Sequence, residues 1–289
     1  MPSLLDLRRR VKSVKNTRQI TKAMKMLSAA KLKRAQDAVT SARPFANKIS
    51  EVLDNLSANV SDDFSHPLLD ARGDERYLIV LVTADKGLCG GFNANLIKAA
   101  HRFIRAHEGQ SVEMMPVGRK GRDFFRRRGF TLVKEYIGLT GKGRVEYADA
   151  VTVAREIIQR FTSDTKIDKV FLVFSDFKSV MTQKPVVEQL LPAARPQLDE
   201  GAASSDYIYE QTPAEIFRKL LPQMVETRIF RALLESVASE HGARMTAMDS
   251  ATTNANDLIN RLTLELNRKR QAAITKEIIE VVSGAAAAS

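Results

Sequence analysis

The chain has 289 residues, enough for two domains or for one domain and an extended element. It holds one cysteine and no apolar run of 18 residues, which excludes an internal disulfide, a cysteine-built metal site and a transmembrane helix. Cys89 alone fits a reducing compartment, and the N-terminus has no apolar signal segment. The net charge is +11, and residues 1–45 carry twelve Lys or Arg against two acids, which predicts an acidic partner for this segment.

Residues 3–59 are predicted to form one long helix. Apolar and small residues recur in it at steps of three and four, the spacing of a coiled-coil seam. The helix would be roughly 85 Å long at 1.5 Å per residue, and Pro44 should bend it. The predicted seam residues are Ile20, Met24, Leu27, Lys31, Ala35, Ala38, Ala42, Phe45, Ile49, Val52 and Leu56.

The middle of the chain alternates strand and helix patterns, which predicts a small α/β domain over residues 76–195. A polar loop precedes it, and a linker at 192–206 follows it. The strands are expected at 77–84, 112–117, 131–137 and 169–177, with an antiparallel edge strand at 185–190. The helices are expected at 94–107, 120–128 and 147–161, the second of them short and basic.

A second long helix is predicted from Pro213, after a capping box at 212–215, to a stop at Gly284. It would be roughly 105 Å long, with Pro222 kinking or delaying its start. Because no compact domain covers such a rod, we expect it to pair antiparallel with the first helix and to project beyond it by roughly 20 Å. Its seam is Ile216, Leu220, Met224, Thr227, Phe230, Leu234, Ala238, His241, Met245, Met248, Thr252, Ala255, Ile259, Leu262, Leu266 and Ala273.

The segment DKGLCGGFN at 85–93 lies between a strand and a helix, where phosphate-binding loops occur. It matches neither G-x-x-x-x-G-K-[ST] nor G-x-G-x-x-G, so we favour a tight packing turn over nucleotide binding. Cys89 is expected to be a small buried residue and not a catalytic thiol, since no His or acid stands beside it.

The four histidines are not spaced as metal ligands, and no Ser/His/Asp or paired-carboxylate constellation stands out. His241 falls on the seam, where we expect it to set the register. The sequence therefore predicts no catalytic residue, no metal and no cofactor. The basic N-terminal helix allows a solvated face, nucleic-acid binding or contact with an acidic protein, and the absence of aromatic residues from 1–44 disfavours the second.

Three stretches resemble the gamma-subunit family of the F-type, proton-transporting ATP synthase. They are ITKAMKMLSAAKL at 20–32, the turn at 85–93 and ITKEIIEVVSGAAA at 274–287. The resemblance spans both ends and the middle of the chain. It implies a long antiparallel coiled coil of the N- and C-terminal helices plus a small Rossmann-like α/β domain. The implied parts are 1–59, 76–195 and 207–284.

The resemblance implies a central rotor shaft that couples proton flow through the membrane c ring to ATP synthesis or hydrolysis in a hexamer of alpha and beta subunits. Nucleotide would bind the hexamer, and this chain would be a non-catalytic subunit. The partners implied are the alpha, beta and epsilon subunits and the c ring, without nucleic acid. Membrane association would come only through the complex, at the cytoplasmic face of a bacterial inner membrane, or at the mitochondrial matrix face for a processed chain.

The resemblance also assigns contact residues. Those expected at the beta subunit are Met24 and Lys25, facing an acidic loop, with Arg268 and Gln271 near the corresponding level. Tyr207 and Glu210 are expected at the c ring. The C-terminal tip, expected to turn inside an apolar collar, is Ile278, Ile279, Val281 and Val282.

Two other classes compete with a rotor subunit. One is a stand-alone coiled-coil protein whose basic helix binds nucleic acid, which salt-dependent DNA binding would support. The other is an enzyme that uses the glycine-rich turn, for which the sequence offers the least support.

Overall fold

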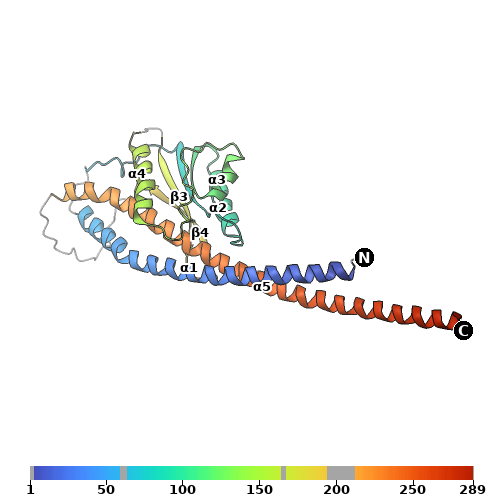
Figure 1. Ribbon diagram of the computed structural model, residues 1–289. Helices are drawn as coiled ribbons and strands as arrows, with labels where there is room; N and C mark the ends of the chain where they lie inside the picture. The colour runs from blue at the N-terminus through green and yellow to red at the C-terminus, as the bar shows by residue number, and fades with distance from the viewer. Residues whose placement is uncertain (1–2, 59–63, 164–166, 194–211, 289) are drawn as a thin grey trace. The chain divides into compact units, whose positions relative to one another are not determined.

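The structure is a computed structural model that describes residues 3–58, 64–163, 167–193 and 212–288. The chain divides into two compact units, Met1–Ser28 with Met245–Ser289, called here the end unit, and Ala29–Arg244, called the domain unit. The helices α1 (Leu4–Ala58) and α5 (Pro213–Ala288) contribute to both (Figure 1). Among the described residues, no helix combines the length and apolar character needed to cross a membrane.

In the end unit the two helices run antiparallel, as predicted. Lys25 pairs with Asp249, and about two turns earlier in α1 Arg18 donates to Asn256. Lower residue numbers in α1 therefore face higher residue numbers in α5. The start of α1 carries a capping box, in which the Ser3 hydroxyl oxygen accepts from the Asp6 N–H at 3.1 Å. The buried line between the helices consists of Leu7, Thr21, Ser28, Met248, Ala255, Ile259 and Leu262.

The predicted seam is wrong in this part of α1. Ile20 and Leu27 are 60% and 58% exposed, whereas their neighbours Thr21 and Ser28 are 7% and 3% exposed. Small hydroxyl side chains let the two helix axes approach closely, and Thr252 Oγ1 donates to Thr21 Oγ1 at 2.8 Å across the seam. The larger apolar residues therefore lie on the outer face.

Both long helices continue past the prolines that were expected to bend or delay them. Pro44 lies inside α1 and Pro222 inside α5. The predicted stop at Gly284 is also wrong, since α5 continues to Ala288. A glycine costs a helix only about 1 kcal/mol, and the alanines that follow it have the highest helix propensity of all residues.

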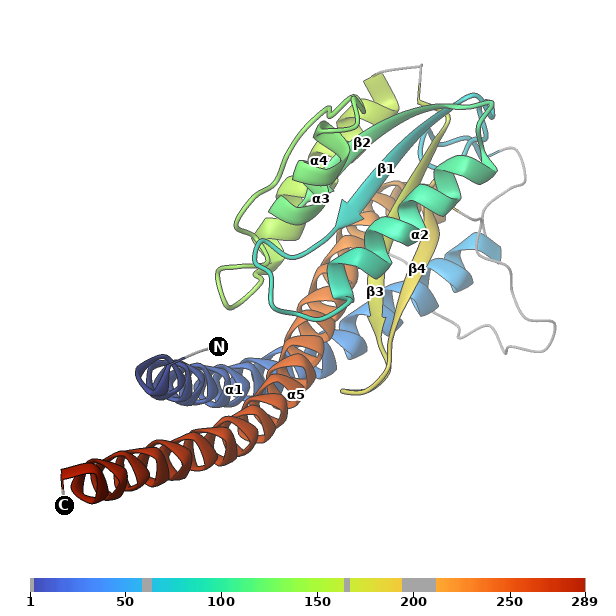
Figure 2. The same ribbon diagram turned by 90° about the vertical axis from the view of Figure 1, so that its right-hand side faces the viewer.

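The domain unit contains a four-stranded sheet in the order β2-β1-β3-β4. β1 (Arg76–Val82) pairs in parallel with β2 (Ser111–Val117) and with β3 (Lys169–Phe177), and β4 (Gln183–Leu191) is antiparallel to β3. The antiparallel edge strand is thus confirmed. The domain's helices, also confirmed, are α2 (Phe92–Ala106), α3 (Arg119–Arg126) and α4 (Tyr147–Ser163) (Figure 2).

Residues 131–137 form no continuous strand, contrary to prediction. They follow the outer edge of β2 through isolated bridges only. The reason is Pro116 in β2, which has no N–H to donate to the ladder. The Val133 carbonyl accepts instead from Arg160 Nη2 at 3.3 Å. Beyond the proline the register shifts, and the Tyr136 N–H donates to the Pro116 carbonyl.

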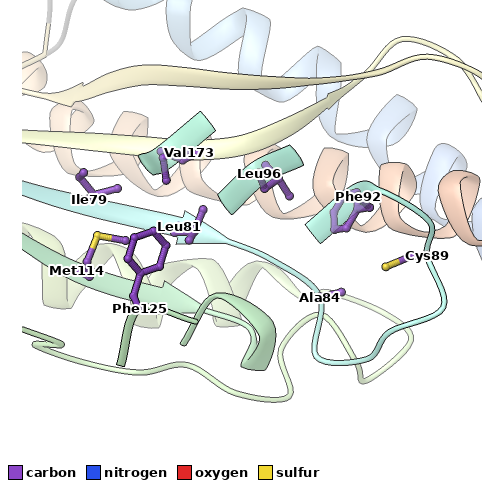
Figure 3. Packing of buried hydrophobic residues seen from close by; sticks show 10 residues of the cluster. Ile79, Leu81, Ala84, Cys89, Phe92, Leu96, Met114, Phe125 and Val173 are labelled. Carbon is purple, nitrogen blue, oxygen red and sulfur yellow. The ribbon is translucent and has the colours of Figure 1, made fainter. Parts of the chain in front are cut away.

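The sheet is buried on both faces. Side chains alternate between the faces of a strand, and all residues from Tyr77 to Val82 are buried. Each large apolar side chain buried in this way contributes about 1.5–3 kcal/mol, which holds α2 and the glycine-rich turn against the strands. The cluster on the α2 face, shown in Figure 3, is Ile79, Leu81, Ala84, Cys89, Phe92, Leu96, Ala100, Met114, Phe125 and Val173.

The helix α5 enters the core of the domain unit. Every residue from Ala232 to Gly242 is buried, where the sequence predicted only a one-sided seam. Small polar side chains are tolerated there because they satisfy the backbone of β3. Ser236 Oγ accepts from the Ser175 N–H at 3.1 Å, and Ser239 Oγ donates to the Ser175 carbonyl at 3.2 Å.

Candidate functional site

The outer face of the end unit is the first candidate surface. Met24 is half-buried there, and Lys25 Nζ lies 2.5 Å from Asp249 Oδ1, with both side chains partly in solvent. The apolar residues Ile20, Met26 and Leu27 of the same stretch of α1 are exposed. This stretch of α1 therefore presents both basic and apolar side chains to solvent. The sequence missed the apolar half because its spacing placed Ile20 and Leu27 in the seam.

The structure separates the two sets of residues expected at the beta subunit. Lys25 is level with Asp249, and the 19 residues from Asp249 to Arg268 span about 28 Å of helix. The expectation that Arg268 and Gln271 lie near the level of Lys25 is therefore wrong. Both side chains are exposed. They lie farther along α5 than Asp249.

The C-terminal tip is apolar and exposed. Ile278 and Ile279 are 57% and 58% exposed, and Val281 and Val282 are 71% and 62% exposed. Four large aliphatic side chains in five residues are thus open to water, and an exposed apolar patch of this kind favours contact with another surface. Tyr207 and Glu210, expected at the c ring, lie outside the described residues.

The glycine-rich turn is bound to its own chain. The Asp85 carboxylate accepts from the N–H groups of Arg119 and Gly138, both at 3.0 Å. The Asn93 side-chain oxygen accepts from the Ala84 N–H at 2.9 Å. These groups tie the start of α3 and a following loop to the turn, as expected of a packing turn. Burial raises the pKa of the Cys89 thiol, which keeps it protonated and unreactive at neutral pH.

A buried polar cluster on α5 holds this turn. Arg244 Nη2 donates to Glu240 Oε1 at 2.6 Å and to the Gly87 carbonyl at 3.3 Å, and Nη1 lies 3.2 Å from His241 Nδ1. Burial raises the pKa of Glu240, with the Arg244 charge opposing that shift. Burial, helped by the charges of Arg244 and Lys31, lowers the pKa of His241 to about 4, so this histidine is neutral at physiological pH. The sequence pattern singled out neither Arg244 nor Glu240.

The last kind of candidate site is a cluster of metal-ligating side chains. In the described ranges, no group of three or more His, Cys, Asp or Glu side chains is placed to hold a metal ion.

Comparison with known proteins decides the family. A family model described as ATP synthase matches residues 3–288. A relative from Solibacter usitatus (strain Ellin6076), an ATP synthase gamma chain, is 55% identical over 291 residues, with 100% of both chains covered. The chain belongs to the ATP synthase gamma chain family. A gamma chain from Pelotomaculum thermopropionicum is 49% identical over 287 residues and covers 99% of each chain.

Solved structures agree with the gamma chain fold. A central stalk and c-ring structure of the mitochondrial ATP synthase of Tetrahymena thermophila contains a chain with a TM-score of 0.61 and 26% identity, covering 80% of this gamma chain and 99% of that chain. A chain of the Euglena gracilis mitochondrial ATP synthase has a TM-score of 0.69 over 98% of this chain and 94% of its own. At 20% identity the second comparison concerns the fold alone.

Proposed function

We propose that the chain is the central rotor shaft of a proton-transporting F-type ATP synthase. It couples proton flow through the membrane c ring to ATP synthesis or hydrolysis in the alpha/beta hexamer. The observation that carries this is the similarity to gamma chains over the full length, at 55% identity. The antiparallel pairing of α1 and α5 in the end unit supplies the elongated element that a shaft requires. Neither the family match nor the structural neighbours favour the nucleic-acid alternative.

The partners of the shaft are the alpha and beta subunits, the epsilon subunit and the c ring. The solved relatives support this, since one is described as a central stalk with its c ring and another as part of an assembly with F1 and a c ring. The parts of the chain are the N-terminal segment at 1–59, the α/β domain at 76–195 and a C-terminal segment from 207 onward, whose helix α5 spans Pro213–Ala288. The α/β domain contacts epsilon, and Tyr207 and Glu210 contact the c ring.

The chain has no catalytic site of its own. Asp85 and Asn93 of its glycine-rich turn accept hydrogen bonds from N–H groups outside the turn, and Arg244 donates to the Gly87 carbonyl, which supports a structural role for the turn. The catalytic nucleotide binds the hexamer. The bacterial origin of the relatives supports a place at the cytoplasmic face of the inner membrane, peripheral and attached only through the complex.

The surface chemistry suits a shaft that must turn. Exposed ion pairs contribute about 0–1 kcal/mol each, so charged contacts through Lys25 or Arg268 exchange readily as the shaft moves. The apolar tip, Ile278 to Val282, fits a collar of similar character at the end of α5. A smooth apolar collar resists tilting of the axis without fixing one angle, because apolar contact has no preferred direction.

Charge reversal tests the beta-subunit contact. Lys25→Glu should lower proton pumping relative to ATP hydrolysis in the reconstituted enzyme, because it places a negative charge before the acidic loop of beta. Arg268→Glu should do the same from its own level of the shaft. Arg105→Glu, an exposed residue of α2, is the matched control and should leave the ratio unchanged.

The Lys25–Asp249 pair makes the test sharper. Lys25→Glu also breaks this pair, so the combined variant Lys25→Glu/Asp249→Lys restores it with reversed polarity. If Lys25 acts on a partner subunit, the combined variant stays uncoupled. Full recovery of coupling would mean that Lys25 only holds α1 to α5, and unchanged coupling in all variants would reject the contact altogether.

A further inference from the structure

The domain unit has a hollow between α2 and α3, two helices visible in Figure 2. Its volume is about 650 Å³, within the range of small-molecule sites in proteins. Residues from both helices and from the segment after α3 line it. The charged or ionisable members are Lys98, His101, Lys120, Asp123, Arg127 and Arg128.

The positive charges of this hollow are not neutralised. Its one acidic member, Asp123, is engaged by Arg122, whose Nη2 lies 2.7 Å from Asp123 Oδ1. This hydrogen bond, with the nearby charge of Arg127, keeps the pKa of Asp123 below its usual value. Within the described part of the chain, Lys98, Lys120 and Arg127 have no ion-pair partner. By contrast, Arg126 of α3 forms an ion pair with Glu135.

One cation is held in place over an aromatic ring. The Arg128 guanidinium carbon lies 3.6 Å from the centre of the Phe124 ring, and Arg128 Nη1 lies 3.5 Å from the Phe124 carbonyl oxygen. Stacking on a ring lowers the rotamer freedom of the arginine and leaves the edge of its guanidinium free for an acceptor. Arginine can bind phosphate oxygens through two N–H groups at once.

We propose that the hollow between α2 and α3 binds a small anion with two or more linked phosphate groups. The hollow is the size of a small-molecule site and is lined by four cations. A ligand with several negative charges close together can neutralise all four, whereas a single carboxylate neutralises only one. Arginine and lysine are the residues that bind phosphate in proteins. Inorganic polyphosphates and nucleoside polyphosphates share this chemistry, and the Phe124 ring gives only the second a further contact. The inference is independent of the shaft function, since it uses neither the end unit nor a partner subunit.

Calorimetric titration of the full chain with inorganic tripolyphosphate, and separately with ATP, tests the proposal. Saturable binding with one site is expected for both. Equal affinity identifies the phosphate chain as the ligand, and at least tenfold tighter binding of ATP identifies the nucleotide. Absence of saturable binding at millimolar ligand overturns the proposal.

Two double variants with the same loss of charge separate a site from general attraction. Lys98→Gln/Arg127→Gln removes cations that line the hollow, whereas Arg102→Gln/Arg105→Gln removes exposed cations of α2 that do not line it. The first should weaken tripolyphosphate binding at least tenfold and the second less than about threefold. Equal weakening overturns the proposal. Tighter binding of a ten-residue glutamate peptide than of tripolyphosphate also overturns it, in favour of an acidic protein partner.

Discussion

The buried Glu240–Arg244 pair should be essential for the stability of the domain unit. The side chain of Arg244 is 10% exposed and that of Glu240 is 6% exposed. Arg244 also bonds the Gly87 carbonyl and His241. Replacing Arg244 by Met keeps the volume but leaves a carboxyl group and a carbonyl oxygen buried without a donor. Breaking a buried pair on one side costs about 3–5 kcal/mol. We expect the lower end, about 3 kcal/mol, because Glu240 can protonate.

Urea unfolding of the full chain, followed by circular dichroism, measures this cost. The combined variant Glu240→Met/Arg244→Met should recover to within about 1–2 kcal/mol of the original chain, since an apolar pair replaces a buried ionic pair at little net cost. Arg228→Met is the matched control on the same helix, because its ion pair with Glu188 is partly in solvent and contributes about 0–1 kcal/mol.

Hydrogen exchange gives a local measure of the same contact. Amides of the glycine-rich turn should exchange faster in Arg244→Met than in the control variant, because the turn loses the donor to the Gly87 carbonyl. A cost below about 1 kcal/mol for Arg244→Met, or a combined variant as unstable as the sum of its parts, would refute the reasoning.

Two further predictions concern pH and one glycine. His241 has a pKa of about 4 when folded and 6.5 as a free side chain, so its unfolded form binds the proton first and stability falls as the pH drops through this range. The unfolding free energy should fall by about 2 kcal/mol by pH 5. The fall is measured relative to a His241→Gln variant, so that the opposite contribution of Glu240 cancels. Equal pH profiles of the two chains would contradict the prediction. Gly118 has φ +106°, and an added Cβ would overlap the Thr83 carbonyl, whereas Gly129 has φ +77° with open space around it. Thermal unfolding should show a loss of stability of about 2–5 kcal/mol for Gly118→Ala and of about 1–2 kcal/mol for Gly129→Ala. Equal losses would contradict a contribution from the clash with Thr83, because backbone strain alone would then account for both.

The hydrophobic patterns of the sequence predicted most of the fold. Continuous apolar runs predicted β1 and β3, and the alternation of elements predicted the α/β domain between two long helices. The failed strand at 131–137 depends on a residue of another strand, Pro116, whose missing N–H matters only once the two segments are adjacent. A pattern within one segment does not contain that information.

The contact surfaces were predicted less well than the helices that carry them. Spacing at three and four fits more than one line along a helix, and the size of Ile20, Leu27 and Phe45 favoured the wrong line. All three are exposed, because close approach of two helices selects small residues such as Thr21 and Ser28. The register of α1 against α5 also had to come from contacts such as Lys25 with Asp249.

The buried cluster of Glu240, His241 and Arg244 was missed for a related reason. On a helix paired with one other helix, charged residues at these positions would lie in solvent. Here the sheet and the glycine-rich turn cover the other side of α5, so the same residues become buried and Arg244 bonds to the Gly87 carbonyl.

Direct observation of rotation tests the central claim. Met181 is 79% exposed and can be replaced by Cys to carry a bead, while the native Cys89 is buried, with a raised pKa, and does not compete for the label. The labelled chain is assembled with an alpha/beta hexamer fixed to a surface and supplied with ATP. The account predicts continuous turning of the bead in one direction. A hexamer that hydrolyses ATP with the chain bound while the bead keeps a fixed angle would contradict it.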